Sequence, residues 1–444
     1  MSVRTTASLP GRAWPLLRRR LRWLVRPPAV REPVPRTAPG ALRLGAAEEE
    51  AAAEAAREVV RGKRLYMYSP SPLAPSRVRR LEQAFARRMA IDHAVAVNSG
   101  TSALVTALAA LGVGPGDEVI VPAYTWFSTA SAVLAVGALP VVAEIDETLT
   151  LDPEDAAGRI SPHTRAVLPV HMRGAAADLE RLQALAREHR LLLLEDAAQA
   201  TGGSYRGRPL GSIGDAGVHS FQQAKLLTSG EGGMVVTGNA ETHRRAAMYH
   251  DAASPAHFGY AIDDWLPGLN LRMTELQAAV LLVQLERLDG LIADLRERKA
   301  RLTELVHDRL AARGVRFRPS NDPEGETGIA LIFFLPEARR TERVVSRLLD
   351  EGVPAARMYQ QLARLPYDGT DLHVYTSWAP LLARRGWSAA GAPWTSHPRP
   401  VELDPDSCPR TLDLLGRAVH VDIGPDLTPE QVAQIASVIV DAAG

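Results

Sequence analysis

The sequence is poor in lysine, cysteine and long apolar runs, and each scarcity excludes something. One cysteine, Cys408, rules out an internal disulfide framework and fits a reducing compartment, so we expect a cytoplasmic protein. No apolar run approaches the roughly 20 residues that a membrane-spanning helix needs. The formal net charge over 444 residues is zero, which argues against a nucleic-acid partner.

The charge is nevertheless uneven along the chain. Residues 1–45 contain ten arginines and one acidic residue, Glu32, so this stretch is strongly basic and the remainder is acidic. Residues 16–26 could form a short basic amphipathic helix against anionic lipid. The alternative is a disordered arm in which the proline-rich residues 27–39 form a linker. We favour the disordered arm and exclude 1–45 from the fold.

Short apolar runs alternate with helical patterns along the next part of the chain. The runs are 94–98, 118–121, 139–145, 166–170, 191–194, 216–221 and 234–237, and helices are expected at about 76–90, 101–112, 127–137 and 178–189. This alternation predicts an α/β fold with a mostly parallel sheet covered by helices. We expect a large domain over 46–290, a long helix over about 272–311, and a smaller α+β domain over 291–444. Residues 366–400 resist assignment.

Three lysines stand against 48 arginines, and one of them occupies a special place. Guanidinium does not lose its proton in proteins, whereas a lysine ammonium does, so an arginine-rich chain needs lysine where an amine must react. Lys63 and Lys299 lie in arginine-rich helical stretches, and we interpret them as scattered lysines without a special role. Lys225 instead follows a predicted strand and precedes the glycine-rich turn 229–233. This placement predicts a Schiff-base lysine.

Three further features follow predicted strands, where ligands bind in parallel sheets. Asn98–Leu104 opens a helix with Ser, Gly and Thr, a pattern typical of a phosphate cradle but also of an ordinary helix cap. Trp126 could stack on a planar ring or simply pack in the core. Asp196 ends an apolar strand and could bind a pyridinium nitrogen or cap a helix. Together with Lys225 they are the parts needed to bind pyridoxal 5′-phosphate (PLP).

Four segments give the chain its resemblance to a known family. They are Asn98–Leu104, Glu195–Ala200, Ser220–Gly233 and Gly268–Ala279. On these motifs the sequence resembles the DegT/DnrJ/EryC1/StrS family of PLP-dependent sugar and cyclitol aminotransferases. The resemblance implies fold type I, with a seven-stranded sheet and a smaller C-terminal domain.

The resemblance also implies the role of each site residue. Lys225 would bind PLP, Asp196 would bind the pyridine nitrogen, Trp126 would stack on the ring, and Gln199 would lie near the ring oxygen. The residues that would hold the phosphate are Gly100, Thr101, Ser102 and Ser220. Asn270 would reach the phosphate of the neighbouring subunit, which implies a homodimer with shared sites. No metal is expected.

An amino group would pass from L-glutamate or L-glutamine to a keto-sugar or keto-cyclitol, as in amino-sugar, aminoglycoside-type or cell-surface glycan biosynthesis. Lysine at 225 argues against a sugar dehydratase, since relatives with that activity carry histidine there. A non-catalytic regulatory or scaffold protein is the remaining alternative. One departure concerns His171–Gly174, where the family often has an aromatic residue and this chain has Arg173. Arg173 could contact the donor carboxylate or a phosphorylated acceptor, or it could be a surface residue.

Overall fold

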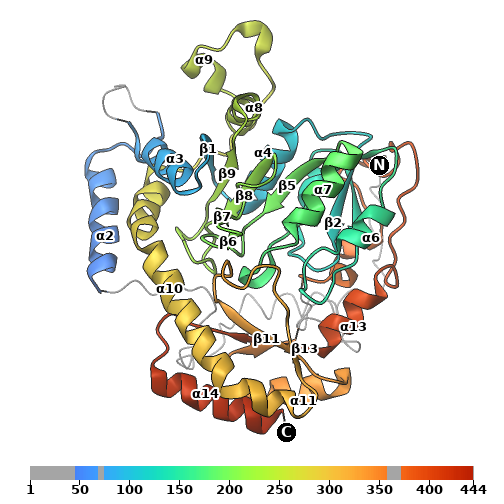
Figure 1. Cartoon of the computed structure of the whole chain (residues 1–444). Coiled ribbons are helices and arrows are strands. Elements are labelled where there is room, and N and C mark those ends of the chain that lie inside the picture. Colours follow the sequence, from blue (N-terminus) through green and yellow to red (C-terminus); the bar gives the residue numbers. More distant parts are fainter. Residues whose placement is uncertain (1–45, 69–74, 358–371, 444) are drawn as a thin grey trace, which may run out of the picture. The chain divides into compact units, whose positions relative to one another are not determined.

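The computed structural model describes residues 46–68, 75–357 and 372–443 (Figure 1). The basic stretch 1–45, for which we predict a disordered arm, lies outside these ranges, as does part of the 366–400 segment. Within the described ranges, no helix combines the length and apolarity needed to cross a bilayer.

The larger of the sheets has seven strands, and each overlaps an apolar run predicted from the sequence. They are β1 (His93–Val97), β2 (Glu118–Pro122), β3 (Leu139–Ala143), β4 (Thr164–Val167), β5 (Leu192–Asp196), β8 (Ala216–Ser220) and β9 (Gly233–Thr237). Their spatial order is β1-β9-β8-β5-β4-β2-β3. β9 is antiparallel to both of its neighbours, and the strands from β8 to β3 are parallel. The predicted mostly parallel sheet is therefore confirmed.

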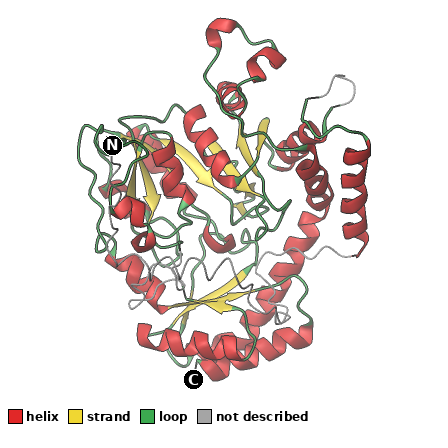
Figure 2. Ribbon diagram, turned by 180° about the vertical axis from the view of Figure 1, so that it is seen from behind, coloured by secondary structure: helices red, strands yellow, loops and turns green. Residues whose placement is uncertain are grey.

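Helices cover both faces of this sheet, as Figures 1 and 2 show. The helices up to residue 258 are α2 (Ala46–Arg61), α3 (Arg77–Arg88), α4 (Gly100–Ala110), α5 (Ser128–Ala135), α6 (Pro153–Gly158), α7 (Leu179–His189), α8 (Ala240–His250) and α9 (Ser254–Phe258), with a short hairpin of β6 (Ser204–Tyr205) and β7 (Arg208–Pro209). Among these helices, α2 and α9 lie apart from the sheet (Figure 1). Alternation along β1 shows why two faces are needed. Val95 and Val97 join the core that contains α4, whereas Ala94 and Ala96 join the core that contains α3.

A long helix, α10 (Glu275–Ala311), runs from the large sheet to a second, smaller sheet. Thr274 and Gln277 form a reciprocal capping box, which fixes its start three residues after the expected one. The small sheet has the order β10 (Arg316–Phe317), β11 (Ala330–Phe334), β13 (Ala418–Asp422) and β12 (Ala355–Ala356). Helices α11 (Ala338–Asp350) and α14 (Pro429–Ala442) lie on the side of the small sheet away from the large one (Figures 1 and 2). The boundary at residue 290 falls inside α10 and stays a prediction.

The segment from residue 372 onward packs back against the large domain. It contains the short helices η3 (Tyr375–Ser377) and α12 (Ala379–Leu382) and continues to α13 (Pro409–Arg417). Backbone N–H groups link it to the end of β2, since Thr125 N donates to His373 O (2.9 Å) and Tyr375 N donates to Ala123 O (3.0 Å). Trp378, which is wholly buried, belongs to the core of the large sheet. These contacts bring His373 to the carboxyl edge of the parallel strands.

Candidate active site

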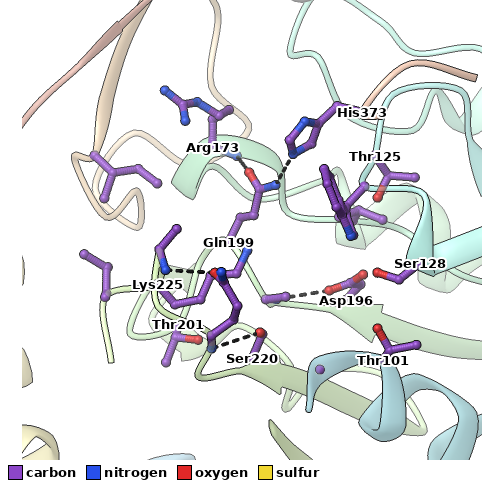
Figure 3. Close-up of a pocket in the computed structure, with 18 of the residues that line it drawn as sticks. Thr101, Thr125, Ser128, Arg173, Asp196, Gln199, Thr201, Ser220, Lys225 and His373 are labelled. Carbon is purple, nitrogen blue, oxygen red and sulfur yellow. Dashed lines mark hydrogen bonds between the residues drawn. The ribbon is translucent and has the colours of Figure 1, made fainter. Parts of the chain in front are cut away.

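A cavity of about 610 Å³ opens at the carboxyl edge of the large sheet (Figure 3). This volume lies in the range of roughly 300–1,000 Å³ that small-molecule and cofactor sites occupy. Seven of the nine residues predicted for the site line it: Gly100, Thr101, Trp126, Asp196, Gln199, Ser220 and Lys225. Ser102 and Asn270 do not line it.

The N-terminus of α4 forms one end of the cavity. Ser99 caps the helix by accepting a hydrogen bond from Ser102 N (3.0 Å), and Ser102 Oγ donates to Asn98 Oδ1 (2.6 Å). A Cβ at Gly100 would lie 2.7 Å from Ser220 Cβ, so only glycine allows α4 to approach the end of β8 this closely. The N–H groups of the first turn have no partner within the helix. This end of the cavity therefore suits an anion.

Asp196, at the end of β5, is buried and faces the cavity (Figure 3). Its carboxylate accepts hydrogen bonds from Thr129 Oγ1 (3.0 Å) and Ala198 N (3.1 Å). Burial raises the pKa of Asp196, and these hydrogen bonds and the charge of Lys225 offset the rise only in part. A buried carboxylate in this condition gains from a cationic or N–H-bearing ligand. Thr129 was not foreseen from the sequence.

Glu195, the preceding residue, points to the other side of β5. It accepts hydrogen bonds from Gly211 N (2.8 Å), Ile213 N (2.6 Å) and Gly214 N (2.7 Å), and from His171 Nε2 (3.0 Å). The other ring nitrogen of His171 accepts from Ala177 N, so the proton lies on Nε2. Burial acts to raise the pKa of Glu195, but His171 and the backbone donors outweigh it and hold the pKa below its usual value.

Lys225 lies in the turn after β8 and reaches the cavity (Figure 3). Burial lowers the pKa of its ammonium; Asp196 opposes this shift and Arg173 adds to it. Burial also lowers the pKa of Lys299, but that ammonium forms an ion pair with Glu326. Among the described carboxylates, none lies within ion-pair distance of Lys225. Its surroundings thus favour the neutral, nucleophilic amine.

Gln199, His373 and Arg173 lie together on another wall of the cavity (Figure 3), and Trp126 also lines it. Gln199 Oε1 accepts a hydrogen bond from Arg173 N (3.2 Å), and its amide nitrogen lies 3.2 Å from His373 Nε2. The ring of Trp126 packs edge-on against that of His373 at a centroid distance of 5.0 Å. His373 comes from the segment that resisted assignment, so sequence reasoning missed it. Its position after Leu372 carries no local signal.

Arg173 lies in a short 3-10 turn, η1 (Met172–Gly174), with backbone angles of φ 54° and ψ 40°. This left-handed conformation costs a non-glycine residue on the order of 1–3 kcal/mol. The Arg173 guanidinium forms an ion pair with Asp422 at the end of β13, and the two side chains are 16% and 13% exposed. Arg173 is therefore not a surface residue. The two remaining interpretations are a contact with the donor carboxylate and a contact with a phosphorylated acceptor.

These residues fit PLP in charge and shape. The cavity offers an anion-binding helix terminus at one end and, between the ends, an incompletely compensated buried carboxylate and a buried lysine whose ammonium pKa is lowered. Gly100 allows the close backbone approach that a bound phosphate requires.

Asn270 stands apart from this group. It is exposed in a segment held against residues 249–252, where Leu269 N donates to Tyr249 O and Leu271 N to His250 O, both at 2.8 Å.

Comparison with known proteins places this site in context. The DegT/DnrJ/EryC1/StrS aminotransferase family matches residues 47–377. L-glutamine:2-deoxy-scyllo-inosose aminotransferase from Streptoalloteichus tenebrarius is 42% identical over 60% of this chain and 64% of its own length. The Streptomyces kanamyceticus enzyme of the same name is 38% identical over 71% of this chain and 77% of its own. The crystal structure of S. venezuelae DesV has a TM-score of 0.72 and 32% identity, and the match covers 90% of this chain and 96% of that one.

Proposed function

Because the chain belongs to the DegT/DnrJ/EryC1/StrS aminotransferase family, we propose that it moves the amino group of L-glutamine to the ketone of a cyclitol. The observation that carries the proposal is one cavity in which Lys225 and Asp196 face each other beside the N-terminus of α4. L-glutamine and a cyclitol ketone are the substrates in the names of the two similar enzymes. The match covers 64% of the length of one enzyme and 77% of the length of the other. A keto-sugar is the second candidate acceptor.

Aminotransferases of this family are PLP-dependent. When bound, PLP supplies a protonated ring that delocalises the negative charge left on a substrate carbon. Lys225 would hold the cofactor through its amine, and the same amine would move the proton to and from the substrate carbon. Its lowered pKa suits both tasks, since a nucleophile and a base must be unprotonated at working pH. Asp196 would keep the pyridine nitrogen of the cofactor protonated.

The remaining predicted residues have binding roles in this proposal. The first turn of α4 with Gly100, Thr101 and Ser220 holds the phosphate. Ser102 acts by fixing that turn, because its N–H and hydroxyl are engaged with Ser99 and Asn98. Trp126 would stack on the ring, and Gln199, which accepts a hydrogen bond from Arg173 N, would lie near the ring oxygen.

We further propose a homodimer in which Asn270 completes the partner's phosphate site. Asn270 is exposed and does not line the cavity of its own subunit. Both properties are required of a residue that acts across a subunit interface. Large apolar side chains are also exposed in the segment that precedes Asn270, at Ile262, Trp265 and Leu269, and at Leu65 and Tyr66. Burying them against a second copy would remove an unfavourable apolar surface.

We also propose a cytoplasmic location and a catalytic role. The single buried thiol of Cys408 is consistent with a cytoplasmic setting. A dehydratase or a regulatory protein is less well supported, because Lys225 and a well-formed cavity are both present.

The acceptor can be tested directly with purified enzyme, PLP and L-glutamine. We expect amine formation on 2-deoxy-scyllo-inosose and little or none on a nucleotide-linked keto-sugar. The reverse preference would replace the cyclitol by the sugar but keep the transamination. If neither ketone is aminated while glutamine still reacts, the proposed acceptor class is wrong.

A further inference from the structure

Two side chains with the basic groups of lysine or arginine line the described cavity, Lys225 and Arg173. Under the proposed function the amine of Lys225 is bonded to the cofactor and is not available as a positive charge for another ligand. Asp196 and the N-terminus of α4 are engaged with the ring nitrogen and the phosphate. Arg173 then remains as the permanent positive charge of the cavity, because a guanidinium does not deprotonate.

The fold holds Arg173 in place from both domains. Its backbone N–H donates to Gln199, and the carbonyl of Met172 accepts from Arg318 Nη1 (3.3 Å). Gly174 has φ 79°, and a Cβ there would lie 2.1 Å from Thr327 Oγ1, so the turn fits closely against the small domain. Asp422 then fixes the guanidinium through the ion pair. Arg173 is therefore fixed at its backbone and at its guanidinium.

The ion pair with Asp422 does not exhaust what this side chain can do. A guanidinium has five N–H donors in a planar fork, so it can contact two carboxylates at once. Asp422 also lowers the cost of keeping a cation in a largely buried place. The arrangement suits a cation that must be oriented before an anionic ligand arrives.

The amino donor of the proposed reaction carries a negative charge next to its reacting carbon. An α-amino acid donor has a carboxylate on the carbon that bears the amino group, so the anion must bind close to Lys225. Arg173 meets this condition, since it lines the same cavity and its charge acts on Lys225: burial is the main cause of the lowered Lys225 pKa, and Arg173 lowers it further. A cyclitol or free sugar ketone carries no such anion.

We propose that Arg173 binds the α-carboxylate of the amino donor and that Asp422 orients it for this purpose. The inference rests on the proposed function and makes Arg173 a determinant of donor specificity. It also separates the two half-reactions: the donor half depends on Arg173, and amination of an uncharged ketone does not.

The test compares L-glutamine with its α-carboxamide, which keeps the reacting amine but lacks the carboxylate. The first half-reaction is followed by the change in cofactor absorbance, without any acceptor. We expect the wild type to require about ten- to a hundredfold more carboxamide for half-saturation, the usual strength of a charged hydrogen bond. Arg173→Met should remove most of this preference by weakening glutamine alone. Arg173→Lys, which keeps the charge and loses the fork, should fall between them.

Arg159→Met is the matched control. Arg159 is also partly buried and paired, with Asp155, but does not line the cavity, so this variant should keep the wild-type preference. Thermal unfolding checks that each variant is folded. If Arg173→Met does not fold, the wild type and Arg173→Lys still decide the matter, because equal half-saturation by glutamine and carboxamide overturns the proposal.

Other outcomes distinguish the sources of the anion. A loss confined to amination of a phosphorylated ketone, with the glutamine half-reaction unchanged, would assign Arg173 to the acceptor and contradict the inference. No reaction of the wild type with any amino acid would instead contradict the proposed function itself.

Discussion

Glu195 and Asp196 are neighbours in sequence, both buried, and opposite in their relation to the rest of the protein. Glu195 receives four hydrogen bonds, three of them from backbone N–H groups, and its pKa is lowered. Asp196 receives two, and its pKa is raised. Strand β5 sends successive side chains to opposite faces, so one carboxylate enters the body of the domain and the other enters the cavity.

The difference shows what a buried charge is for. A carboxylate whose partners are all supplied by the fold stabilises that fold and has little left to offer a ligand. A carboxylate that burial has left short of partners costs stability until a ligand compensates it. The cavity face of β5 is thus built for binding and the opposite face for structure.

The largest effect is expected for Lys225→Ala on the cavity face. This change removes the amine that bonds the cofactor, so turnover and the visible absorbance of lysine-bound PLP should both disappear. Lys63→Ala is the control, because Lys63 is exposed and should leave both intact. Transamination that persists in Lys225→Ala would contradict the site assignment.

Asp196→Asn should separate catalysis from stability. Turnover should fall by at least about a hundredfold, as for other losses of an electrostatic contact at the reacting group. Folding of the cofactor-free protein should not suffer. A carboxyl whose folded pKa is raised contributes stability at pH values below its unfolded pKa and loses that contribution as pH rises through the folded pKa. Asparagine avoids that cost at neutral pH.

Turnover and denaturant-induced unfolding of the same Asp196→Asn preparation check both halves of this prediction. A cofactor-free variant that is less stable than the wild type at neutral pH would show that Asp196 is structural after all.

Glu195→Gln should give the reverse pattern. Glutamine offers one acceptor oxygen and an NH₂ group that faces backbone donors, so we expect a loss of about 3–5 kcal/mol in the free energy of unfolding. The lowered pKa of Glu195 means that its stabilisation is present above the unfolded carboxyl pKa and is lost as pH falls through the folded value. The difference between wild type and variant should therefore shrink on acidification. A constant difference across pH would refute the electrostatic explanation.

The smallest effect is expected for Asn270→Ala, a change at a residue away from β5, and this variant tests whether Asn270 serves the cavity of a second subunit. PLP affinity should fall by about ten- to a hundredfold, the worth of one hydrogen bond to a charged group. Mixed dimers of this variant with Lys225→Ala should regain one wild-type site if Asn270 acts across the interface. Mixed dimers without any wild-type site would place Asn270 in its own subunit.

The sequence was sufficient to predict most residues that line the cavity, because these residues follow strands directly. All seven strands were predicted, and the carboxyl edge of a parallel sheet brings Gly100, Asp196, Ser220 and Lys225 together without further information. Thr129, His373 and the Arg173–Asp422 pair could not be predicted in this way. Arg173 and Asp422 are 249 residues apart and meet only because the small sheet packs beside the cavity.

Glu195 was overlooked for a related reason. Its partners His171, Gly211, Ile213 and Gly214 come from loops on either side of β5. Nothing in the local pattern distinguishes a carboxylate with four donors from one with two. The strand alternation alone indicates that Glu195 and Asp196 face opposite ways.

The most direct test of the account is an absorbance spectrum of the PLP-loaded wild-type protein before and after addition of L-glutamine, with no acceptor present. Lysine-bound PLP absorbs in the visible, and the proposed function predicts that glutamine abolishes this band while one equivalent of the 2-oxo acid appears per site. A visible band that persists, with no 2-oxo acid released, would contradict transamination from glutamine. The absence of any visible band after loading with PLP would contradict the role of Lys225 on which the account depends.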